Sequence, residues 1–285
     1  MIVISTVKEI RSLTRKLNLS PVGFVPTMGA LHEGHLSLVG AAATQCPLVV
    51  VSIFVNPTQF NDKNDLKNYP RDIERDLGLL KNILRENDIV FTPSVEEIYP
   101  EEDRRIFNFG NLDKVMEAAH RPGHFNGVGQ VVSRLFEIVK PDIAIFGQKD
   151  FQQLAVIKDL VRQTGDKVTI ISHPIIREED GLAMSSRNVL LEPEIRKNAP
   201  VIFRTISAAS EMIDFHDIPE IKNFVRKMIN SVPGFEIEYF DIADDTELIP
   251  VNFRSEMQKN KRYFGCIAVR AGKIRLIDNI EFGLV

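Results

Sequence analysis

The sequence predicts an α/β protein in which a doubly wound parallel β-sheet is followed by a smaller α+β domain. Through about residue 175, short β-branched runs alternate with segments of helical apolar spacing, the order of a βαβ sheet with right-handed crossovers. The run Leu48–Val55 (LVVVSIFV) has little polar alternation, as a strand buried on both faces does. Beyond residue 175, two helical patterns precede alternating strands. We therefore predict a Rossmann-like domain over residues 1–175 and an α+β domain over residues 176–285 that forms a lid over the site.

Local patterns give the elements of the first half. Helical apolar spacing and a capping threonine predict a helix at Thr6–Leu17, and the apolar run Val22–Val25 predicts a strand that breaks at Pro26. Further helices are expected at about Gly34–Gln45, Asp72–Arg85, Leu112–Ala119, Val128–Val139 and Phe151–Arg162. Further strands are expected at Leu48–Val55, Asp88–Phe91, Asp142–Phe146 and Lys167–Ile171. The expected irregular segments are a mobile stretch at Asn61–Asn68, a surface excursion at Thr92–Arg105 and a loop at Arg121–Gly127.

The second half changes from alternating elements to helices followed by strands. Helices are expected at about Glu194–Ile213 and Ile218–Ile229. Strands are expected at Phe235–Ile242, Tyr263–Val269 and Ile274–Asp278, with Ala271, Gly272 and Lys273 turning the last hairpin. This module of roughly 110 residues is large enough to support its own core.

The composition is that of a soluble globular protein, with 44% hydrophobic and 26% charged residues. The longest strongly apolar run, Pro47–Val55, is far shorter than the ~20 residues of a membrane helix. The N-terminus carries charges where a secretory signal would be apolar, so we expect a cytoplasmic protein without membrane partners. A net charge of −4 argues against a main role in coating nucleic acid. Cys46 and Cys266 have no zinc-ligand spacing and are expected to be reduced, buried thiols.

The stretch from Gly23 to Leu38 (GFVPTMGALHEGHLSL) is the first candidate for chemistry. It reads as strand, turn and helix, and it places His32 and His35 one helical turn apart beside the backbone N–H groups and positive dipole end of the helix. A phosphate is favoured at such a position. A zinc site is disfavoured, because the H-E-x-x-H motif needs histidines four residues apart.

Two further polar groups fall on loops, at a strand end and at the domain junction. The first is Gln148, Lys149, Asp150, Gln152 and Gln153, which could equally be a capping acid and a solvated lysine. The second is Met184, Ser185, Ser186 and Arg187, whose hydroxyls and guanidinium can hold a phosphate, although a serine-rich linker is a commoner explanation. The sequence contains no P-loop, no dinucleotide-binding glycine motif and no G-x-S-x-G elbow.

Five blocks taken together resemble one enzyme family over nearly the whole chain. In order they are PTMGALHEGH, FVNPTQF, RPGHFNGV, FGQKDFQQL and LAMSSRN, and they closely resemble the pantoate–β-alanine ligases (pantothenate synthetases). His32 to His35 resembles the HxGH signature of the nucleotidyltransferase superfamily that includes class I aminoacyl-tRNA synthetases. Met184 to Arg187 occupies the place of the second, KMSKS-like loop of that superfamily.

The resemblance implies an ATP-dependent ligase that acts in two steps. The carboxylate of pantoate attacks the α-phosphorus of ATP and gives pantoyl adenylate and pyrophosphate. The amine of β-alanine then attacks the acyl carbon and gives pantothenate and AMP. No protein nucleophile is needed, so catalysis is expected to rest on positioning and charge stabilisation.

The resemblance also implies roles for single residues, carried over by position. The catalytic residues on the phosphates would be His32, His35, Lys149, Ser185, Ser186 and Arg187. The other residues of the ATP pocket would be Thr27, Met28, Gly147, Asp150, Ile176 and Met184. Pantoate would be held by Gln59 and Gln153, with Asn56, Arg121 and His124 nearby. Mg²⁺ is expected with ATP, held largely by phosphates and water. Asp76 is the one acidic residue where the family has its acidic cluster. The family also suggests a homodimer.

Three other functions fit parts of the sequence. Another nucleotidyltransferase of the superfamily would share the histidines, but the glutamines and the Arg121 to His124 block speak against it. A tRNA synthetase is disfavoured because the chain is short and acidic and has no evident RNA-binding face. A non-catalytic nucleotide-binding protein with a regulatory C-terminal domain belongs to a different class, and the intact histidines, Lys149 and Arg187 argue against it.

Overall fold

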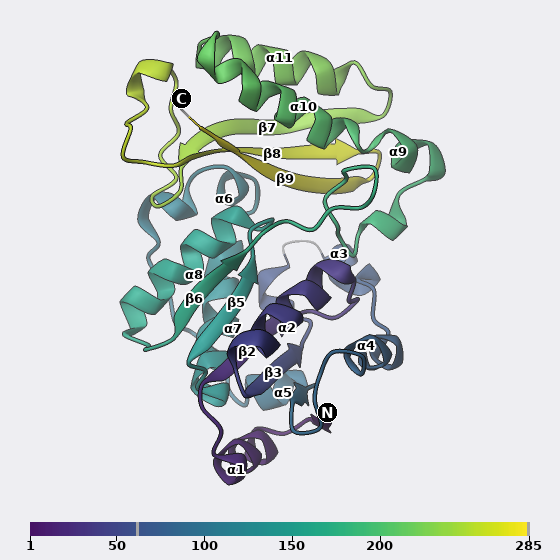
Figure 1. The fold of residues 1–285 in the computed structure, drawn as a ribbon, viewed down its shortest axis with the longest axis vertical. Helices are drawn as coiled ribbons and strands as arrows, with labels where there is room; N and C mark the ends of the chain where they lie inside the picture. The colour runs from purple at the N-terminus through teal and green to yellow at the C-terminus, as the bar shows by residue number, and fades with distance from the viewer. Residues whose placement is uncertain (61–62, 284–285) are drawn as a thin grey trace.

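The larger of the two sheets is parallel throughout and confirms the predicted doubly wound fold (Figure 1). The structure is a computed structural model that describes residues 1–60 and 63–283. The six strands run in the order β1-β4-β3-β2-β5-β6. They are β1 (Ile2–Ile4), β2 (Val22–Thr27), β3 (Leu48–Ile53), β4 (Ile89–Phe91), β5 (Ile143–Gly147) and β6 (Thr169–His173). The order reverses between β2 and β5, and ligands bind open α/β sheets outside the carboxyl ends of such strands.

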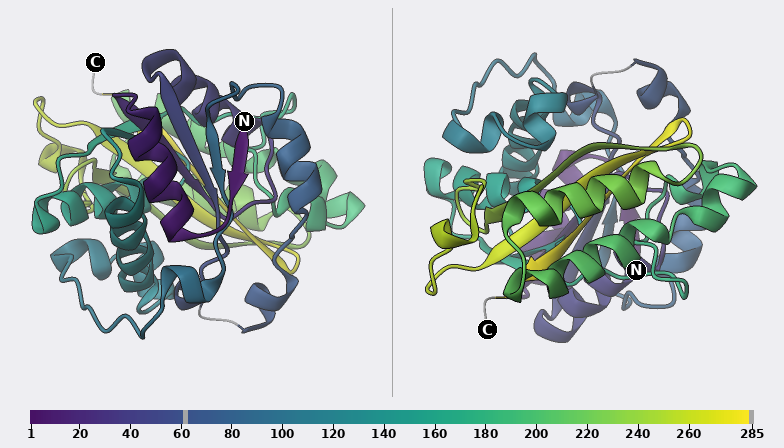
Figure 2. Two further views of the ribbon diagram at one scale, coloured as in Figure 1. Left: turned by 90° about the horizontal axis from the view of Figure 1, so that it is seen from below. Right: turned by 90° about the horizontal axis from the view of Figure 1, so that it is seen from above.

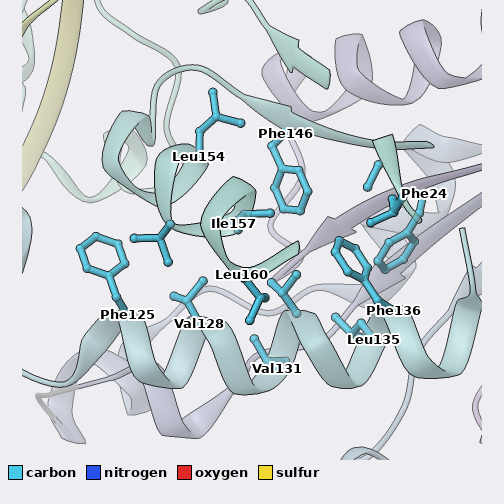
Figure 3. Close-up of a cluster of buried hydrophobic side chains, with 14 of the residues drawn as sticks. Phe24, Phe125, Val128, Val131, Leu135, Phe136, Phe146, Leu154, Ile157 and Leu160 are labelled. Carbon is cyan, nitrogen blue, oxygen red and sulfur yellow. The ribbon is translucent and has the colours of Figure 1, made fainter. Parts of the chain in front are cut away.

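Helices cover both faces of this sheet because the buried strands present apolar side chains on both. In β3, Leu48 and Val50 belong to a core shared with α1 (Val7–Leu17), α7 (His124–Val139) and α8 (Phe151–Thr164). Val49 and Val51 face the opposite core, which includes residues of α2 (Glu33–Gln45) and α4 (Ile73–Leu80). Figure 3 shows the first core, where Phe24 of β2 meets Phe136 of α7 edge-on at 6.2 Å between ring centroids.

The second half forms an antiparallel sheet with helices on its outer face. Its strands are β7 (Phe235–Asp244), β8 (Tyr263–Ala271) and β9 (Ile274–Phe282). Helices α10 (Val201–Glu211) and α11 (Ile218–Asn230) lie across it (Figure 2, right), and α9 (Pro193–Asn198) precedes them. The other face packs on the first half, where the rings of Phe264 and Phe151 lie 4.4 Å apart.

The remaining elements are short. They are the helices α3 (Lys63–Asn68), α5 (Val95–Ile98) and α6 (Glu117–His120), and the 3₁₀ turns Pro57–Gln59, Gly110–Asp113, Asn188–Leu190, Met212–Asp214 and Arg254–Glu256. In the described parts of the chain, no helix is long and apolar enough to cross a membrane.

Several predicted boundaries were wrong, mostly where proline or a short element was involved. The sequence did not predict β1, because three residues are too few for a periodic pattern. Strand β2 does not break at Pro26 but continues to Thr27. Pro26 is tolerated because the pairing of β2 with β5 ends at Phe24, so no partner on that side needs a backbone N–H from residue 26. The predicted helix Glu194–Ile213 is instead α9 and α10, split at Pro200, which has no N–H for a helical bond.

Other differences are shifts of a few residues. Helix α7 begins at His124, so the predicted loop is shorter and the histidine lies on the helix. The predicted helix Leu112–Ala119 is a 3₁₀ turn and α6, separated by Met116 with φ of 46°. Helix α4 ends at Leu80, and β6 lies two residues later than predicted at both ends. Part of the expected mobile stretch is helix α3, and Asn61 and Asp62 lie outside the described residues.

Candidate functional site

A cavity of about 220 Å³ opens at the carboxyl ends of β2 and β5, where the strand order reverses. The segment that follows β6 borders it on a further side. The structure thus brings together groups that lie more than 150 residues apart in the chain. The predicted residues that line this cavity are Thr27, Met28, His32, His35, Asn56, Gln59, Gly147, Lys149, Asp150, Gln153, Ile176, Met184, Ser185, Ser186 and Arg187.

The two histidines sit at the start of α2 as the motif predicted. His32 is the N-cap, and its ring Nδ1 accepts a hydrogen bond from the Gly34 N–H at 3.1 Å. A neutral His32 therefore carries its proton on Nε2. A Cβ on Gly34 would lie 2.8 Å from the His32 ring, so only glycine leaves the ring this position. The rings of His32 and His35 are 4.1 Å apart.

Both histidines are held in the neutral form. Burial, reinforced by the charge of Lys149, lowers the pKa of His32 to about 4. Burial and the neighbouring His32 lower the pKa of His35 to about 3. The Nδ1 atom of His35 is buried without a hydrogen-bond partner among the described residues. The imidazoles can therefore donate N–H groups, while the positive charge at this wall comes from Lys149 and Arg187.

Lys149 follows the end of β5 and is partly buried in the cavity wall. Burial lowers its pKa, while the carboxylates of Asp150 and Asp278 act in the opposite direction. A bound anion would stabilise the charged form of this amine strongly, because burial has removed water that would otherwise solvate the ammonium and weaken the attraction.

The chain segment after β6 contributes Ser185, Ser186 and Arg187 to the cavity wall. The Ser185 hydroxyl accepts a hydrogen bond from the Arg187 N–H at 3.2 Å, which shapes the turn. The Ser186 hydroxyl is 3.4 Å from the hydroxyl of Tyr69, and the Arg187 guanidinium lies 5.6 Å from the centroid of the Tyr69 ring. Tyr69 was missed as a site residue, because nothing in the local sequence around it indicates contact with residues over 100 positions later.

Gln59 is oriented by a close contact between its 3₁₀ turn and α7. A Cβ on Gly127 would lie 2.5 Å from the backbone oxygen of Thr58, so a glycine is needed where the helix meets the turn. The ring Nδ1 of His124 is 2.8 Å from the backbone oxygen of Gln59. The Gln59 amide donates to the Met28 sulfur at 3.0 Å. The RPGHFNG block thus positions the turn that carries Gln59.

Asn56 has a mainly structural set of contacts although it borders the cavity. It is fully buried, and its amide donates to the oxygens of Thr58, Gln59 and Gly127. Its carbonyl accepts from the Tyr99 hydroxyl at 3.0 Å. Gln152, which the sequence placed in the Lys149 group, is likewise buried. Its side chain bonds to the backbone of Glu117 in α6 and of Leu112 and Val115, which precede α6.

Arg121 and His124 do not line the main cavity. They border an adjoining cavity of about 30 Å³, together with Glu117, Tyr239 and Asn279. Lys149, Asp150 and Gln153 line both cavities and so lie between them. Burial lowers the pKa of His124 to about 4. The structure therefore places these two residues beside the main cavity, and their contact with substrate stays a prediction.

Asp76, the predicted magnesium ligand, is engaged by backbone donors of the turn before α2. Its carboxylate is buried and accepts the backbone N–H groups of Ala30 and Leu31 at 2.9 and 2.8 Å. It fixes the turn that precedes His32, in which Gly29 and Ala30 both have positive φ. Among the described residues, no group of three or more His, Cys, Asp or Glu side chains could hold a metal ion. Asp76 therefore has a structural role in this turn, and its part in binding Mg²⁺ stays a prediction.

The apolar walls of the cavity were also missed, because core and pocket residues look alike in sequence. They are Pro26, Leu38, Phe54, Val128, Val131, Val132, Leu135, Ile145, Phe146, Pro174 and Ile175.

Comparison with known proteins supports one family. The family model described as pantoate-beta-alanine ligase matches residues 2–281. A pantothenate synthetase of Azobacteroides pseudotrichonymphae is 50% identical, over 99% of this chain and 100% of that protein. A crystal structure of pantothenate synthetase from Thermus thermophilus superposes with a TM-score of 0.91 at 44% identity, covering 100% of both chains. A pantoate-beta-alanine ligase from Francisella tularensis, complexed with beta-gamma ATP and beta-alanine, gives a TM-score of 0.80 at 34% identity, covering 100% and 99%.

Proposed function

The chain belongs to the pantoate–β-alanine ligase family, and from that premise we propose which of its residues carry the reaction. It is an ATP-dependent ligase that condenses pantoate with β-alanine through pantoyl adenylate. In the first step a pantoate carboxylate oxygen attacks the α-phosphorus, and pyrophosphate leaves. In the second step the β-alanine nitrogen attacks the acyl carbon, loses a proton, and AMP leaves.

We assign the phosphate contacts to the two histidines, Lys149 and the Ser185 to Arg187 turn. The observation that carries this assignment is their position around one cavity at the sheet's reversal point. The first step moves negative charge onto the oxygen between the α- and β-phosphorus. An ammonium, a guanidinium and neutral imidazole N–H donors fixed beforehand stabilise that charge at little reorganisation cost. Thr27, Met28, Gly147, Asp150, Ile176 and Met184 complete the nucleotide pocket.

Gln59 and Gln153 are assigned to pantoate. Neutral amides can bind the hydroxyl and carboxylate groups of a diol acid without competing for the phosphates. Gln153 lines both cavities, which supports a place between the acid and the incoming amine. Arg121 and His124 are assigned to the substrate side through the smaller cavity, and Asn56 supports Gln59.

Mg²⁺ is proposed to accompany ATP and to be held by phosphate oxygens and water. The protein groups near the turn of Asp76 do not supply a coordination shell, and no step above depends on a protein-bound ion.

The two halves are proposed to be domains, residues 1–175 and 176–285, with the second covering the site. In support, the second half has a hydrophobic core of its own between its sheet and α10 and α11. We propose that the segment 180–188 closes on the reactants and shields the adenylate from water. Protease cleavage in this segment should slow when ATP and pantoate are both present. Equal cleavage rates with and without them would argue against closure.

A homodimer is also proposed. Ile106 is 88% exposed and lies in an irregular segment, in which the backbone groups of Arg105 and Phe107 bond to the Asn126 side chain. The N–H and C=O of Ile106 have no partner in the described part of the chain, so these groups and the exposed side chain are available to a second copy. Ile106→Arg should then yield monomers in light scattering. A variant that stays dimeric would place the interface elsewhere.

The buried free thiols Cys46 and Cys266 are compatible with the proposed cytoplasmic location.

Isotope exchange between pyrophosphate and ATP tests the site assignment. Exchange should require pantoate and proceed without β-alanine. Lys149→Ala and His35→Ala should lower it by about two to four orders of magnitude with folding intact. Lys158→Ala, an exposed lysine on α8, is the matched control. A loss of tenfold or less would remove the varied residue from the phosphate site, and exchange that needed β-alanine would contradict the sequential mechanism.

A further inference from the structure

Two consecutive residues of β9, Asp278 and Asn279, reach from the second half of the chain into the wall of the site. Both are buried, at 4% and 2% exposed. The Asn279 amide nitrogen donates to the backbone oxygens of Gln148 and Lys149 at 2.9 and 3.1 Å. The Gln148 amide returns a longer bond of 3.4 Å to the Asn279 oxygen. The backbone that carries the Lys149 ammonium is therefore held by a residue 130 positions away.

Asp278 holds the other phosphate-side segment. Its two carboxylate oxygens accept from Arg177 at 2.7 and 2.9 Å. Arg177 also donates to the Gly181 oxygen at 3.1 Å, and its backbone forms an isolated antiparallel bridge with Ala183. Ala183 directly precedes the Met184 to Arg187 turn. The backbone N–H of Asn279 donates to the same Asp278 carboxylate at 2.8 Å. This bond links the Asp278–Arg177 pair to the contact between Asn279 and the Lys149 backbone.

We infer that Asp278 and Asn279 fix the two phosphate-binding segments relative to each other, and that Asn279 is a positioning residue for Lys149. The inference rests on the proposed role of Lys149. Both polar atoms of the Asn279 side chain are engaged by the protein, so its effect on reactants is indirect. Charge stabilisation depends on sub-ångström placement, and a freed carbonyl pair would let the lysine backbone move.

The molecule offers a matched control for Asn279. The Asn111 amide nitrogen also donates to two consecutive backbone oxygens across the two halves, those of Glu247 and Leu248, at 2.9 and 3.3 Å. These contacts lie outside both cavities that form the site. Asn111→Ala therefore removes the same kind of bridge between the halves without touching the Lys149 segment.

Pyrophosphate–ATP exchange is measured for the wild type, Asn279→Ala, Asn279→Asp and Asn111→Ala, with thermal unfolding of each. Asn279→Ala should lower the kcat of exchange by about 10- to 100-fold while the KM for ATP changes less than about threefold. Asn279→Asp keeps the size but loses the donors, so it should be as impaired as the alanine variant. Asn111→Ala should exchange at close to the wild-type rate. An active Asn279→Asp enzyme, or equal losses at Asn111 and Asn279, would overturn the inference.

A double-mutant cycle separates positioning from general damage. If Asn279 acts through Lys149, Asn279→Ala should have almost no further effect once Lys149 is already alanine. Multiplicative losses in the double variant would show that Asn279 acts by another route. If the wild type shows no pantoate-dependent exchange, the proposed function fails instead. If Lys149→Ala alone leaves exchange within tenfold of wild type, the Lys149 assignment fails before the role of Asn279 is in question.

Discussion

The imidazole of His32 lies over Gly34, and its Nδ1 atom accepts the Gly34 N–H at 3.1 Å. This single contact caps α2, fixes the tautomer and directs Nε2–H away from the helix end. It explains physically why a glycine stands directly before His35: a methyl group at position 34 would lie 2.8 Å from the His32 ring.

The first prediction concerns that glycine. Gly34→Ala should lower pantoate-dependent exchange by about 10²-fold or more, because the His32 ring must move by an amount that the reaction geometry does not tolerate. Gly40→Ala in the same helix has nothing within 4 Å of the new Cβ and is the control. It should raise the free energy of unfolding by about 0.5–1 kcal/mol and leave exchange unchanged. Normal exchange by Gly34→Ala would show that the His32 position is not critical.

The second prediction concerns stability at acid pH. His35 has a folded pKa of about 3, below its ordinary value, so the unfolded chain binds the proton more readily. The stabilisation is complete above the unfolded pKa near 6.5 and is lost as pH falls toward the folded pKa. As pH falls from 7 to 5, protonation linked to this residue alone should lower the free energy of unfolding by about 2 kcal/mol. Urea unfolding of His35→Gln should therefore show a weaker decline over this range than the wild type, and an equal decline would contradict the prediction.

The third prediction concerns the contact between the two halves at Glu117 and Arg275. The carboxylate accepts two hydrogen bonds from the guanidinium at 2.8 and 2.7 Å and one from the Tyr239 hydroxyl. Burial alone would raise the pKa of Glu117, but Arg275, with smaller contributions from Tyr239 and Arg121, offsets this and the pKa is lowered.

Glu117→Ala should lower the free energy of unfolding by about 1.5–3 kcal/mol, because the half-buried Arg275 guanidinium loses two charge-assisted hydrogen bonds and keeps only Glu238. Chemical denaturation of Arg275→Met and of the double variant would complete the cycle. The double variant should recover part of the loss, and strictly additive losses would contradict a coupled pair.

The fourth prediction concerns Gly127, where α7 meets the turn of Gln59. Gly127→Ala should raise the KM for pantoate and lower stability by about 1–3 kcal/mol. The physical reason is that a Cβ 2.5 Å from the Thr58 oxygen forces the two elements apart. Gly78→Ala in α4 has open space around it and should leave both quantities near their wild-type values or slightly improve stability. Unchanged pantoate kinetics in Gly127→Ala would separate this contact from substrate binding.

The sequence predicted those parts of the molecule that are encoded by neighbouring residues. Buried strands such as Leu48–Ile53 follow from continuous apolar runs, and α2, predicted at about Gly34–Gln45, follows from the helical pattern after the turn. Hydrophobic periodicity could not predict β1, because a strand of three residues is too short to show a repeat. It could not predict the interruption at Pro200 either, because a proline inside a helical pattern can either break or bend the helix.

By itself the sequence determined the parallel α/β fold, the family, and the residues that carry strand-end or helix-start motifs. Only the tertiary structure decided what holds those residues in place. Asn279 reaches Lys149 from 130 positions away, and Arg275 reaches Glu117 from 158. Neither contact leaves a local pattern, because each depends on how the antiparallel sheet packs against the first half. The contacts of Asp76 with the backbone N–H groups of Ala30 and Leu31 depend on packing in the same way, because they join residues more than 40 positions apart.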